Sequence, residues 1–467
     1  MLLPAVDPSK PPPGPFRPEF WRSPLRGPWL TAVLGLVLLI GLPVVMVTGL
    51  LSNDAYQPGL FGNALGRNIS GPLDFYLFGW PTGPSWLYAL SQGLHVTIGL
   101  ALFPVVLAKL WSVIPRLFEW PPVRSPAHAL ERLSLALLVG GALFEFVTGI
   151  LNIQYWYAFP FSFVQAHYYG AWVFIGAFIA HVSLKFGTMR RGLKMRREVV
   201  GGAGVGVGTA SGVGLGAGVG GGAGAGGGAG AGGGAGAGGG AGAPSRGPHD
   251  PALDEPSLVA VSPAPATMSR RALLGTVAAG SMLLLVQGAG QSIGGPLRSL
   301  AFLLPRGRVR PGPLGFPVNK TAVAAGITGP SVSATWRLRI AGARSVSFTR
   351  EQLLAMPQHT YDLPIACVEG WSTTQRWSGV RLRDLATLCG VRGPARVYTA
   401  SLDPGTYGHA TLGHEQVADD RSLLALRVNG LDLSLDHGYP ARIICPAIPG
   451  DHCTKWVTNM KFTGMAA

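Results

Sequence analysis

Cysteine is scarce in this sequence, and its shortage excludes several kinds of metal centre. Only 4 of the 467 residues are cysteine: Cys367, Cys389, Cys445 and Cys453. None forms a CxxC pair with another. The sequence therefore has no attachment motif for a c-type haem and no cysteine spacing typical of an iron–sulfur cluster.

Charged residues are also few, 13% of the chain, and acidic residues are the scarcer kind. Lys and Arg number 37 against 22 Asp and Glu, which gives a formal net charge of +15. Such an excess would suit a nucleic-acid partner if it covered one surface. Here the basic residues gather beside long apolar runs, so the charge indicates membrane topology, and we expect no nucleic-acid partner.

Long apolar runs are abundant, because 48% of the residues are hydrophobic. Four strong runs and a weaker fifth lie at about 29–51, 86–110, 133–151, 163–184 and 272–290. Each is close to the roughly 20 residues that a helix needs to cross a bilayer. One such run is most simply a buried core helix, but four with aromatic residues at their ends predict a membrane protein.

These runs predict a multi-domain protein with an N-terminal all-α transmembrane bundle in the lipid bilayer. After a Pro-rich segment at 1–28, we expect four helices over 29–187 and a fifth, anchoring helix over 269–291. Lys and Arg gather before the first run, in the second connection and after the fourth run. The positive-inside bias therefore predicts a multi-pass protein of the cytoplasmic membrane whose residues after 291 are extracytoplasmic.

Residues 188–268 contain a long Gly/Ala-rich stretch. A silk-like sheet is one interpretation, but so much glycine makes ordering entropically costly, and we predict a flexible cytoplasmic linker. Arg270 and Arg271 follow it, directly before the weak fifth run. They can be the basic flank of a membrane helix or an internal twin-arginine signal for export of a folded domain, and the two interpretations are compatible.

Histidine inside a bilayer is rare and usually functional. His167 and His181 lie on the fourth run, about four helical turns apart, and therefore share one face roughly 21 Å apart along the axis. This arrangement suits two haems stacked across the membrane, with His95 as the opposite ligand of the outer haem and His128 of the inner one. Histidines that hydrogen-bond between packed helices are the alternative. Glu145 also has two interpretations: it can be a proton relay at a quinone site, or a protonated residue that packs against a neighbouring helix.

The histidine spacing over about 85–187 resembles that of the di-haem cytochrome b subunits of membrane-bound formate dehydrogenases and hydrogenases. The resemblance implies that 29–187 is a four-helix transmembrane cytochrome b-like domain with two b-type haems. It also implies electron exchange with the quinone pool.

Residues 315–467, which follow a connector at 292–314, have a different pattern. Short runs rich in Val, Ile and Thr, such as "ATWRLRIAG" and "ARVYTAS", alternate with turn sequences such as "VNG". A helix is expected at about 381–389. The pattern predicts an α+β domain of about 150 residues, large enough for a core of its own.

Two sequence blocks of this domain carry a specific pattern. The first is "CVEGW" with the following "WSGVRL", and the second is "LLALRVNGLDLSLDHGYPARIICP" followed by "PGDHCTKWV". Both resemble the sulfite oxidase family of molybdopterin-dependent oxidoreductases. No arginine lies between Cys367 and Arg376, so the resemblance is closest to the methionine-sulfoxide reductase catalytic subunit branch. It implies an enzyme with a molybdenum–molybdopterin cofactor, in which one protein thiolate binds the metal.

The resemblance also implies a set of site residues, by their positions in these motifs. Cys367 matches the molybdenum ligand. Tyr407, in "DPGTYGHA", matches a tyrosine near the metal, with an ordinary strand aromatic as the alternative. The residues that match cofactor-holding positions are Asn319, His437, Arg442, Cys453, Thr454 and Lys455. Cations and amide donors among them suit an anionic phosphate.

The two parts together predict a membrane-bound molybdopterin-dependent oxidoreductase. It would couple oxygen-atom transfer on a small extracytoplasmic substrate, an S-oxide, N-oxide or small oxyanion, to the quinone pool through b-type haems. Two alternatives stay open. The exported domain can be a non-catalytic module on a membrane anchor, or the chain can be a quinol-linked b-haem reductase of another kind.

Overall fold

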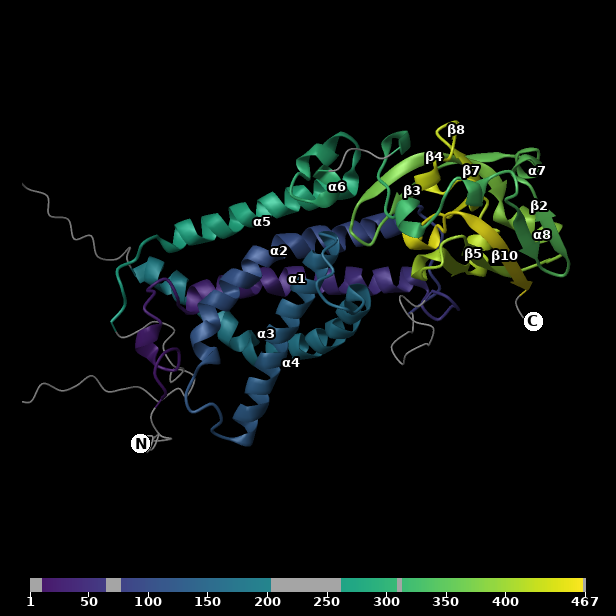
Figure 1. Cartoon of the computed structure of the whole chain (residues 1–467). Helices are drawn as coiled ribbons and strands as arrows, with labels where there is room; N and C mark the ends of the chain where they lie inside the picture. Colours follow the sequence, from purple (N-terminus) through teal and green to yellow (C-terminus); the bar gives the residue numbers. More distant parts are fainter. Residues whose placement is uncertain (1–10, 64–76, 203–261, 309–312, 465–467) are drawn as a thin grey trace, which may run out of the picture.

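The computed structural model describes residues 11–63, 77–202, 262–308 and 313–464, with the side chains of 195–202 excepted. Within these ranges the chain forms a group of long helices and a C-terminal domain built on two β-sheets (Figure 1). Most of the predicted linker at 188–268 lies outside the described residues, so its conformation stays a prediction.

Five helices in the described part of the chain are long and apolar enough to cross a membrane. They are α1 (Pro28–Tyr56), α2 (Leu87–Leu117), α3 (Pro126–Ile153), α4 (Phe163–Gly202) and α5 (Arg270–Ile293). Each overlaps one of the five predicted apolar runs, so these helices are confirmed. Two begin at a serine cap, because Ser125 accepts a hydrogen bond from His128 N and Ser269 accepts one from Ala272 N.

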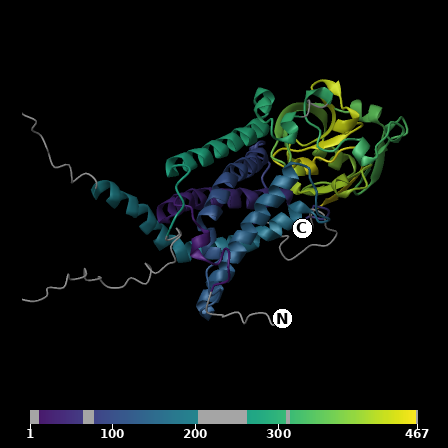
Figure 2. The same cartoon turned by 60° about the vertical axis from the view of Figure 1, so that its left-hand side comes forward.

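Helix α5 packs within the helical group, although it follows the linker. It lies along α2, which also packs against α1, while α3 packs against α4 and α4 against α1 (Figures 1 and 2). The close approach of α5 to α2 depends on Gly288, because a Cβ there would lie 2.8 Å from the Cα of Thr97. The fifth helix therefore packs against the helices that precede the linker.

The C-terminal domain contains two five-stranded sheets. Their strand orders are β2-β1-β10-β5-β6 and β3-β4-β7-β8, with β9 paired to β7 in the second. The strands are β1 (Leu338–Ala341), β2 (Ser345–Phe348), β3 (His359–Ala366), β4 (Ser372–Arg381), β5 (Ala395–Ser401), β6 (His409–Leu412), β7 (Leu423–Val428), β8 (Leu431–Asp432), β9 (Arg442–Ile444) and β10 (Val457–Gly464). The β1–β10 pair is parallel and the other described pairs are antiparallel.

Short helices complete this domain and confirm the predicted α+β class. They are α7 (Arg350–Leu354), α8 (Leu382–Leu388) and α9 (His414–Ala418), while α6 (Pro305–Arg308) lies in the connector. Helix α8 coincides with the helix expected at about 381–389. One hydrophobic core joins both sheets and includes the fully buried Trp377, Leu385 and Val397.

The C-terminal domain sits on one end of the helical group (Figures 1 and 2). Helix α2 contacts β3, and α5 contacts β4. Trp80 Nε1 donates a hydrogen bond to Ala447 O at 2.6 Å, and Asn63 Nδ2 donates one to Thr411 O at 2.9 Å. These buried contacts link the loop after α1 to the domain and fix how the two parts meet.

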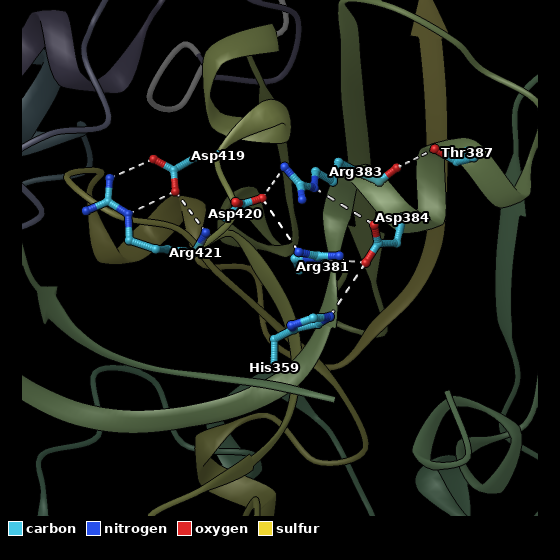
Figure 3. A network of polar contacts seen from close by, with 8 residues as sticks. All are labelled: His359, Arg381, Arg383, Asp384, Thr387, Asp419, Asp420 and Arg421. Atoms are coloured by element: carbon cyan, nitrogen blue, oxygen red, sulfur yellow. Dashed lines mark hydrogen bonds and ion pairs between the residues drawn. The ribbon is translucent and has the colours of Figure 1, made fainter. Parts of the chain in front are cut away.

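A network of polar contacts lies on the C-terminal domain, and one of its residues also contacts the helical part (Figure 3). Arg421 pairs with Asp419 at 2.6 Å and donates to Thr82 O, in the segment before α2, at 3.0 Å. Arg381 pairs with Asp384 at 2.8 Å in the same network. Of the residues drawn in Figure 3, Arg421 is the one that reaches the segment before α2, and its pairing with Asp419 holds its side chain toward Thr82 O.

Candidate functional site

The lone Cys367 lies in a tight turn between β3 and β4. Its backbone N–H donates to Trp371 O at 3.0 Å, and Gly370 N donates back to Cys367 O at 2.9 Å. Gly370 has a φ of 86°, a left-handed conformation that favours glycine. Burial, followed by the nearby Glu369 carboxylate, raises the pKa of the Cys367 thiol well above its ordinary value. The cofactor-free chain therefore keeps this sulfur as a thiol, and a bound metal would be needed to hold it as a thiolate.

A cluster of buried bases lies on the segments around β9. Arg442 donates to His437 O at 3.0 Å and to Cys453 O at 3.2 Å. Lys455 Nζ donates to Asp436 O at 2.9 Å and to Lys320 O. The cluster thus binds mostly backbone carbonyls, and its positive charges are held close together away from water.

The electrostatics of this cluster favour an anion. Burial lowers the pKa of Arg442 to about 10, and burial followed by Arg442 lowers the pKa of Lys455 well below its ordinary value. Burial, then Arg442 and Lys455, lowers the pKa of His437 to about 4. Each shift means that the positive form is penalised, because a buried charge needs a partner.

Two polar atoms of the cluster show that these residues fit an anionic cofactor. Arg442 Nε and His437 Nε2 are buried and have no hydrogen-bond partner within the described residues. Buried donors without partners are costly, and an oxyanion would satisfy both while neutralising the excess charge. The arrangement therefore fits the phosphate-bearing pterin that the sequence resemblance implies.

Three more residues were predicted to hold the cofactor: Cys453, Thr454 and Asn319. Cys453 and Thr454 are buried beside it, where Thr454 Oγ1 lies 3.2 Å from Thr399 Oγ1. Asn319 accepts a hydrogen bond from Arg306 at its backbone oxygen, 3.2 Å away. The role of each of these residues stays a prediction.

Tyr407 lies near the cysteine turn and is 48% exposed, so it is not a simple core aromatic. Burial of its hydroxyl raises its pKa, with further contributions from Asp451, Tyr157 and Cys367. Its neighbour Tyr157 comes from the loop between α3 and α4. The exposed side of the cysteine site is thus shared by the C-terminal domain and the helical part.

A buried carboxylate to which no role was assigned from the sequence lies beside the cysteine. Glu369 accepts hydrogen bonds from Tyr155 OH and from Trp371 Nε1, the latter at 2.7 Å. Arg306 Nε lies 3.7 Å from the same carboxylate, and its guanidinium stacks 4.7 Å over the Tyr155 ring. Burial raises the pKa of Glu369. Glu369 is part of the "CVEGW" motif. Its partners Tyr155 and Arg306 come from distant segments, and no local sequence pattern predicts that they contact it.

A second carboxylate near the cysteine was also missed. Asp451 Oδ2 accepts a hydrogen bond from Tyr56 OH, at the end of α1, at 2.9 Å. The Tyr56 ring also packs edge-on against His452, with ring centroids 5.2 Å apart. Burial raises the pKa of Asp451 to about 6, so its carboxyl can hold or release a proton near neutral pH.

The helical part brings two of the four predicted histidines together. The ring centroids of His95 and His167 are 6.0 Å apart and the rings are nearly perpendicular. His95 Nδ1 bonds to Val45 O at 3.0 Å, and His167 Nδ1 lies 3.0 Å from Thr148 Oγ1 and 3.1 Å from Glu145 Oε2. Both rings line a cavity of about 220 Å³ between the helices.

The other two histidines lie apart from this cavity. His128 and His181 both interact electrostatically with Glu131 of α3, whose carboxylate pairs with Lys185 at 2.8 Å. His128 Nδ1 accepts a hydrogen bond from Arg124 N. In the described ranges, no group of three or more His, Cys, Asp or Glu side chains is placed so that it could hold a metal ion.

Comparison with known proteins supports the C-terminal site. Residues 326–466 match the family described as oxidoreductase molybdopterin binding domain. Mitochondrial sulfite oxidase of Mus musculus is 30% identical over 186 residues, which are 33% of this chain and 33% of that protein. The NAD(P)H nitrate reductase of Hordeum vulgare is 30% identical over 192 residues, 34% of this chain and 21% of that protein.

Two further proteins are similar. The uncharacterized oxidoreductase YuiH of Bacillus subtilis (strain 168) is 30% identical over 131 residues, 27% of this chain and 65% of that protein. A structure of the sulfane dehydrogenase SoxCD from Paracoccus pantotrophus has 27% identity and a TM-score of 0.27, and covers 29% of this chain and 39% of that one. The chain thus spans a third or less of the length of the sulfite oxidase and nitrate reductase relatives.

The buried cationic cluster and the family match together define the class of the C-terminal region: it is an oxidoreductase domain that binds molybdopterin. More particularly, this region of the chain is similar to parts of the sulfite oxidase and nitrate reductase enzymes.

Proposed function

We propose that this chain is a membrane-bound molybdopterin-dependent oxidoreductase. It would exchange an oxygen atom with a small extracytoplasmic substrate and exchange electrons with the quinone pool through b-type haem. One observation supports the coupling most directly: Val368, the residue after Cys367, lines the same cavity as His95 and His167. A redox group in that cavity would therefore lie against the cysteine segment.

The molybdenum–molybdopterin cofactor would supply the oxygen-atom transfer. Cys367 would hold the metal, while Arg442, Lys455 and His437 would hold the anionic end of the pterin. Their positions are set by backbone hydrogen bonds before any ligand arrives, which reduces the cost of binding. Asp451 Oδ2 would hold the proton that a departing oxygen needs, since burial raises its pKa to about 6.

The geometry of His95 and His167 supports one haem in the cavity. His95 and His167 would hold the haem iron, because their ring centroids lie 6.0 Å apart and both side chains line the same cavity. Metal-binding histidines usually donate their other N–H to a carbonyl or carboxylate, as Nδ1 of each ring does here. A second haem between His128 and His181 stays a prediction, supported only by their shared proximity to Glu131.

Glu145 supports a quinone site near the outer haem position. Its Oε2 lies 3.1 Å from His167 Nδ1, and its buried Oε1 has no hydrogen-bond partner among the residues described. Both side chains face the cavity. A carboxyl so placed can accept a proton when a quinol is oxidised, which favours the relay over the packing interpretation.

The proposed sidedness places the molybdopterin domain outside the cytoplasm. Ser269 caps α5, so Arg270 and Arg271 lie in its first turn, at the opposite end of the helix from the domain. Arg270 donates to Leu25 O and Pro24 O in the basic N-terminal segment. This basic end suits the cytoplasmic surface.

Replacing Arg270 and Arg271 with lysine tests the twin-arginine proposal. We expect α1 to α4 to insert normally while the C-terminal domain stays inside, because the export signal needs both arginines. Protease treatment of spheroplasts reads out the location. A C-terminal domain that external protease still cleaves in the double variant would show that ordinary secretion suffices.

The overall proposal is tested by purifying the full chain and measuring its molybdenum, pterin and haem contents. The reduced haem is then mixed with a panel of S-oxides, N-oxides and oxyanions. Substrate-dependent reoxidation of the haem supports the proposal. A chain without molybdenum would instead be a non-catalytic exported module or another kind of b-haem reductase.

A further inference from the structure

The peptide that follows Cys367 is bound by a side chain from a membrane helix. Gln92 of α2 donates a hydrogen bond from Nε2 to Val368 O. Its Oε1 accepts a hydrogen bond from Ser52 Oγ of α1 at 2.6 Å. Gln92 is only 4% exposed. The nitrogen and the oxygen of this buried amide therefore both form hydrogen bonds. The nitrogen binds Val368, the residue next to the Cys367 thiol.

The rest of the turn is seated on the helices in the same way. Gln291 and Ser292 of α5 donate to Glu369 O and Gly370 O at 2.7 and 2.6 Å. A Cβ on Gly370 would lie 2.7 Å from the Cβ of Val96 on α2. Three successive carbonyls after the thiol thus bind side chains from outside their own domain. The helices, and not only the sheets, determine where the cysteine turn lies.

Gln92 lies where the histidine cavity and the cysteine turn meet. His95 follows it by three positions on α2, so the two side chains share a helical face. Both line the cavity, and Val368 lines it as well. A polar amide inside an apolar helix is expensive unless its hydrogen bonds are made, and it usually has a function.

We propose that Gln92 is a positioning residue that holds the cysteine turn against the His95–His167 cavity, and that electrons cross between the two domains at this contact. The inference rests on the proposed function, because it requires a redox group at each side of the contact. Gln92 itself neither gains nor loses an electron or a proton. It keeps the distance between the two redox sites short by fixing Val368.

The electron balance of the reaction sets what crosses this contact. When a quinol is oxidised to quinone, it releases an electron pair and two protons. The reduction of an S-oxide to a sulfide consumes an electron pair and two protons, and the departing oxygen leaves as water. In the opposite direction the same electron pair crosses the contact from the substrate to a quinone.

The first test is Gln92→Leu in the full chain, which removes the amide and keeps most of the volume. The matched control is Gln57→Leu, since Gln57 is also buried between the domains and donates to Gln416 Oε1 at 3.3 Å. Two activities are compared: reoxidation of the reduced haem by substrate, and turnover driven by reduced viologen, which supplies electrons to the molybdenum site directly.

We expect Gln92→Leu to slow haem reoxidation by about tenfold, the effect that losing one hydrogen bond has on a conformational equilibrium. Viologen-driven turnover, molybdenum content and the haem spectrum should stay at wild-type levels. The Gln57→Leu variant should keep both activities. Equal haem reoxidation in wild type and Gln92→Leu overturns the proposal. An equal loss of both activities also overturns it, because it indicates a general structural role.

Hydrogen exchange supplies a readout that does not depend on turnover. Backbone amides of the peptide around 367–372 should exchange faster in Gln92→Leu than in wild type or Gln57→Leu, and unchanged exchange would refute the positioning role. If Gln92→Leu does not fold, Ser52→Ala releases the Oε1 end and should give a smaller effect in the same direction. A wild-type chain without haem overturns the proposed function and the electron contact together, while exchange still decides the positioning role.

Discussion

Replacing Arg442 with methionine gives the sharpest prediction about the molybdopterin site. The guanidinium donates to His437 O and Cys453 O, and it stacks 5.1 Å over the Trp377 ring. Burial lowers its pKa from 12.5 to about 10, so holding its charge in the cofactor-free chain costs about 3 kcal/mol. An anionic phosphate that pairs with Arg442 removes this cost.

The substitution should therefore act differently on the cofactor-free and the loaded chain. Without cofactor, the substitution removes the cost of burying the Arg442 charge. This gain should offset the loss of two hydrogen bonds, which contribute roughly 0.5–1.5 kcal/mol each. The free energy of unfolding should then stay unchanged or rise by up to about 2 kcal/mol. With cofactor, the lost charge-assisted contact of about 1.5–3 kcal/mol should weaken binding roughly 10- to 150-fold.

Molybdenum and pterin per chain measure the binding, and urea unfolding of the cofactor-free chain measures stability. Arg350→Met is the matched control. Arg350 also stacks on an aromatic ring, Tyr439 at 4.8 Å, but it already has a carboxylate partner in Asp432 at 2.8 Å. Arg350→Met should keep its cofactor. A full cofactor content in Arg442→Met would refute the assignment of this cluster to an anion.

Three further predictions address the thiol, the haem and the buried acid. Cys367→Ser should keep much of the pterin yet abolish turnover, whereas the buried Cys445→Ser should do neither, as measured by pterin content and substrate-driven haem oxidation. His167→Ala should remove the haem absorption band of the outer site while molybdenum content is retained, and an unchanged spectrum would exclude His167 as a ligand. Asp451 has a folded pKa raised to about 6, so the folded chain binds its proton more tightly than the unfolded chain does. The contribution of Asp451 to stability should thus fall by up to about 3 kcal/mol as the pH rises from about 4 to about 6, and the overall pH dependence should be weaker by that amount in Asp451→Asn.

Local features of the sequence were enough to predict the elements that carry the site. The apolar runs at 29–51 and 86–110 became α1 and α2, because a run of bilayer length is itself a local signal. The helix expected at about 381–389 was found as α8. Motif positions also placed His437, Arg442 and Lys455 in one buried cluster, because these residues come from neighbouring segments.

Contacts between the two parts could not be predicted in this way. Glu369 was visible in "CVEGW", but its donor Tyr155 is 214 positions away and belongs to the helical part. The pairing of His95 with His167 was expected, whereas its closeness to the cysteine turn was not. The packing of α5 against α2 was also missed, since the smallness of Gly288 has meaning only once Thr97 is opposite it.

The sequence by itself determined the helices, the α+β domain and the family motif, because each depends on residues close together in the chain. Only the tertiary structure decided that the cysteine turn is held by the long apolar helices. Gln92 and Val368 are 276 positions apart, and their hydrogen bond forms only when two separately patterned domains are docked. A buried amide has no preference for a distant carbonyl until packing removes the water from both.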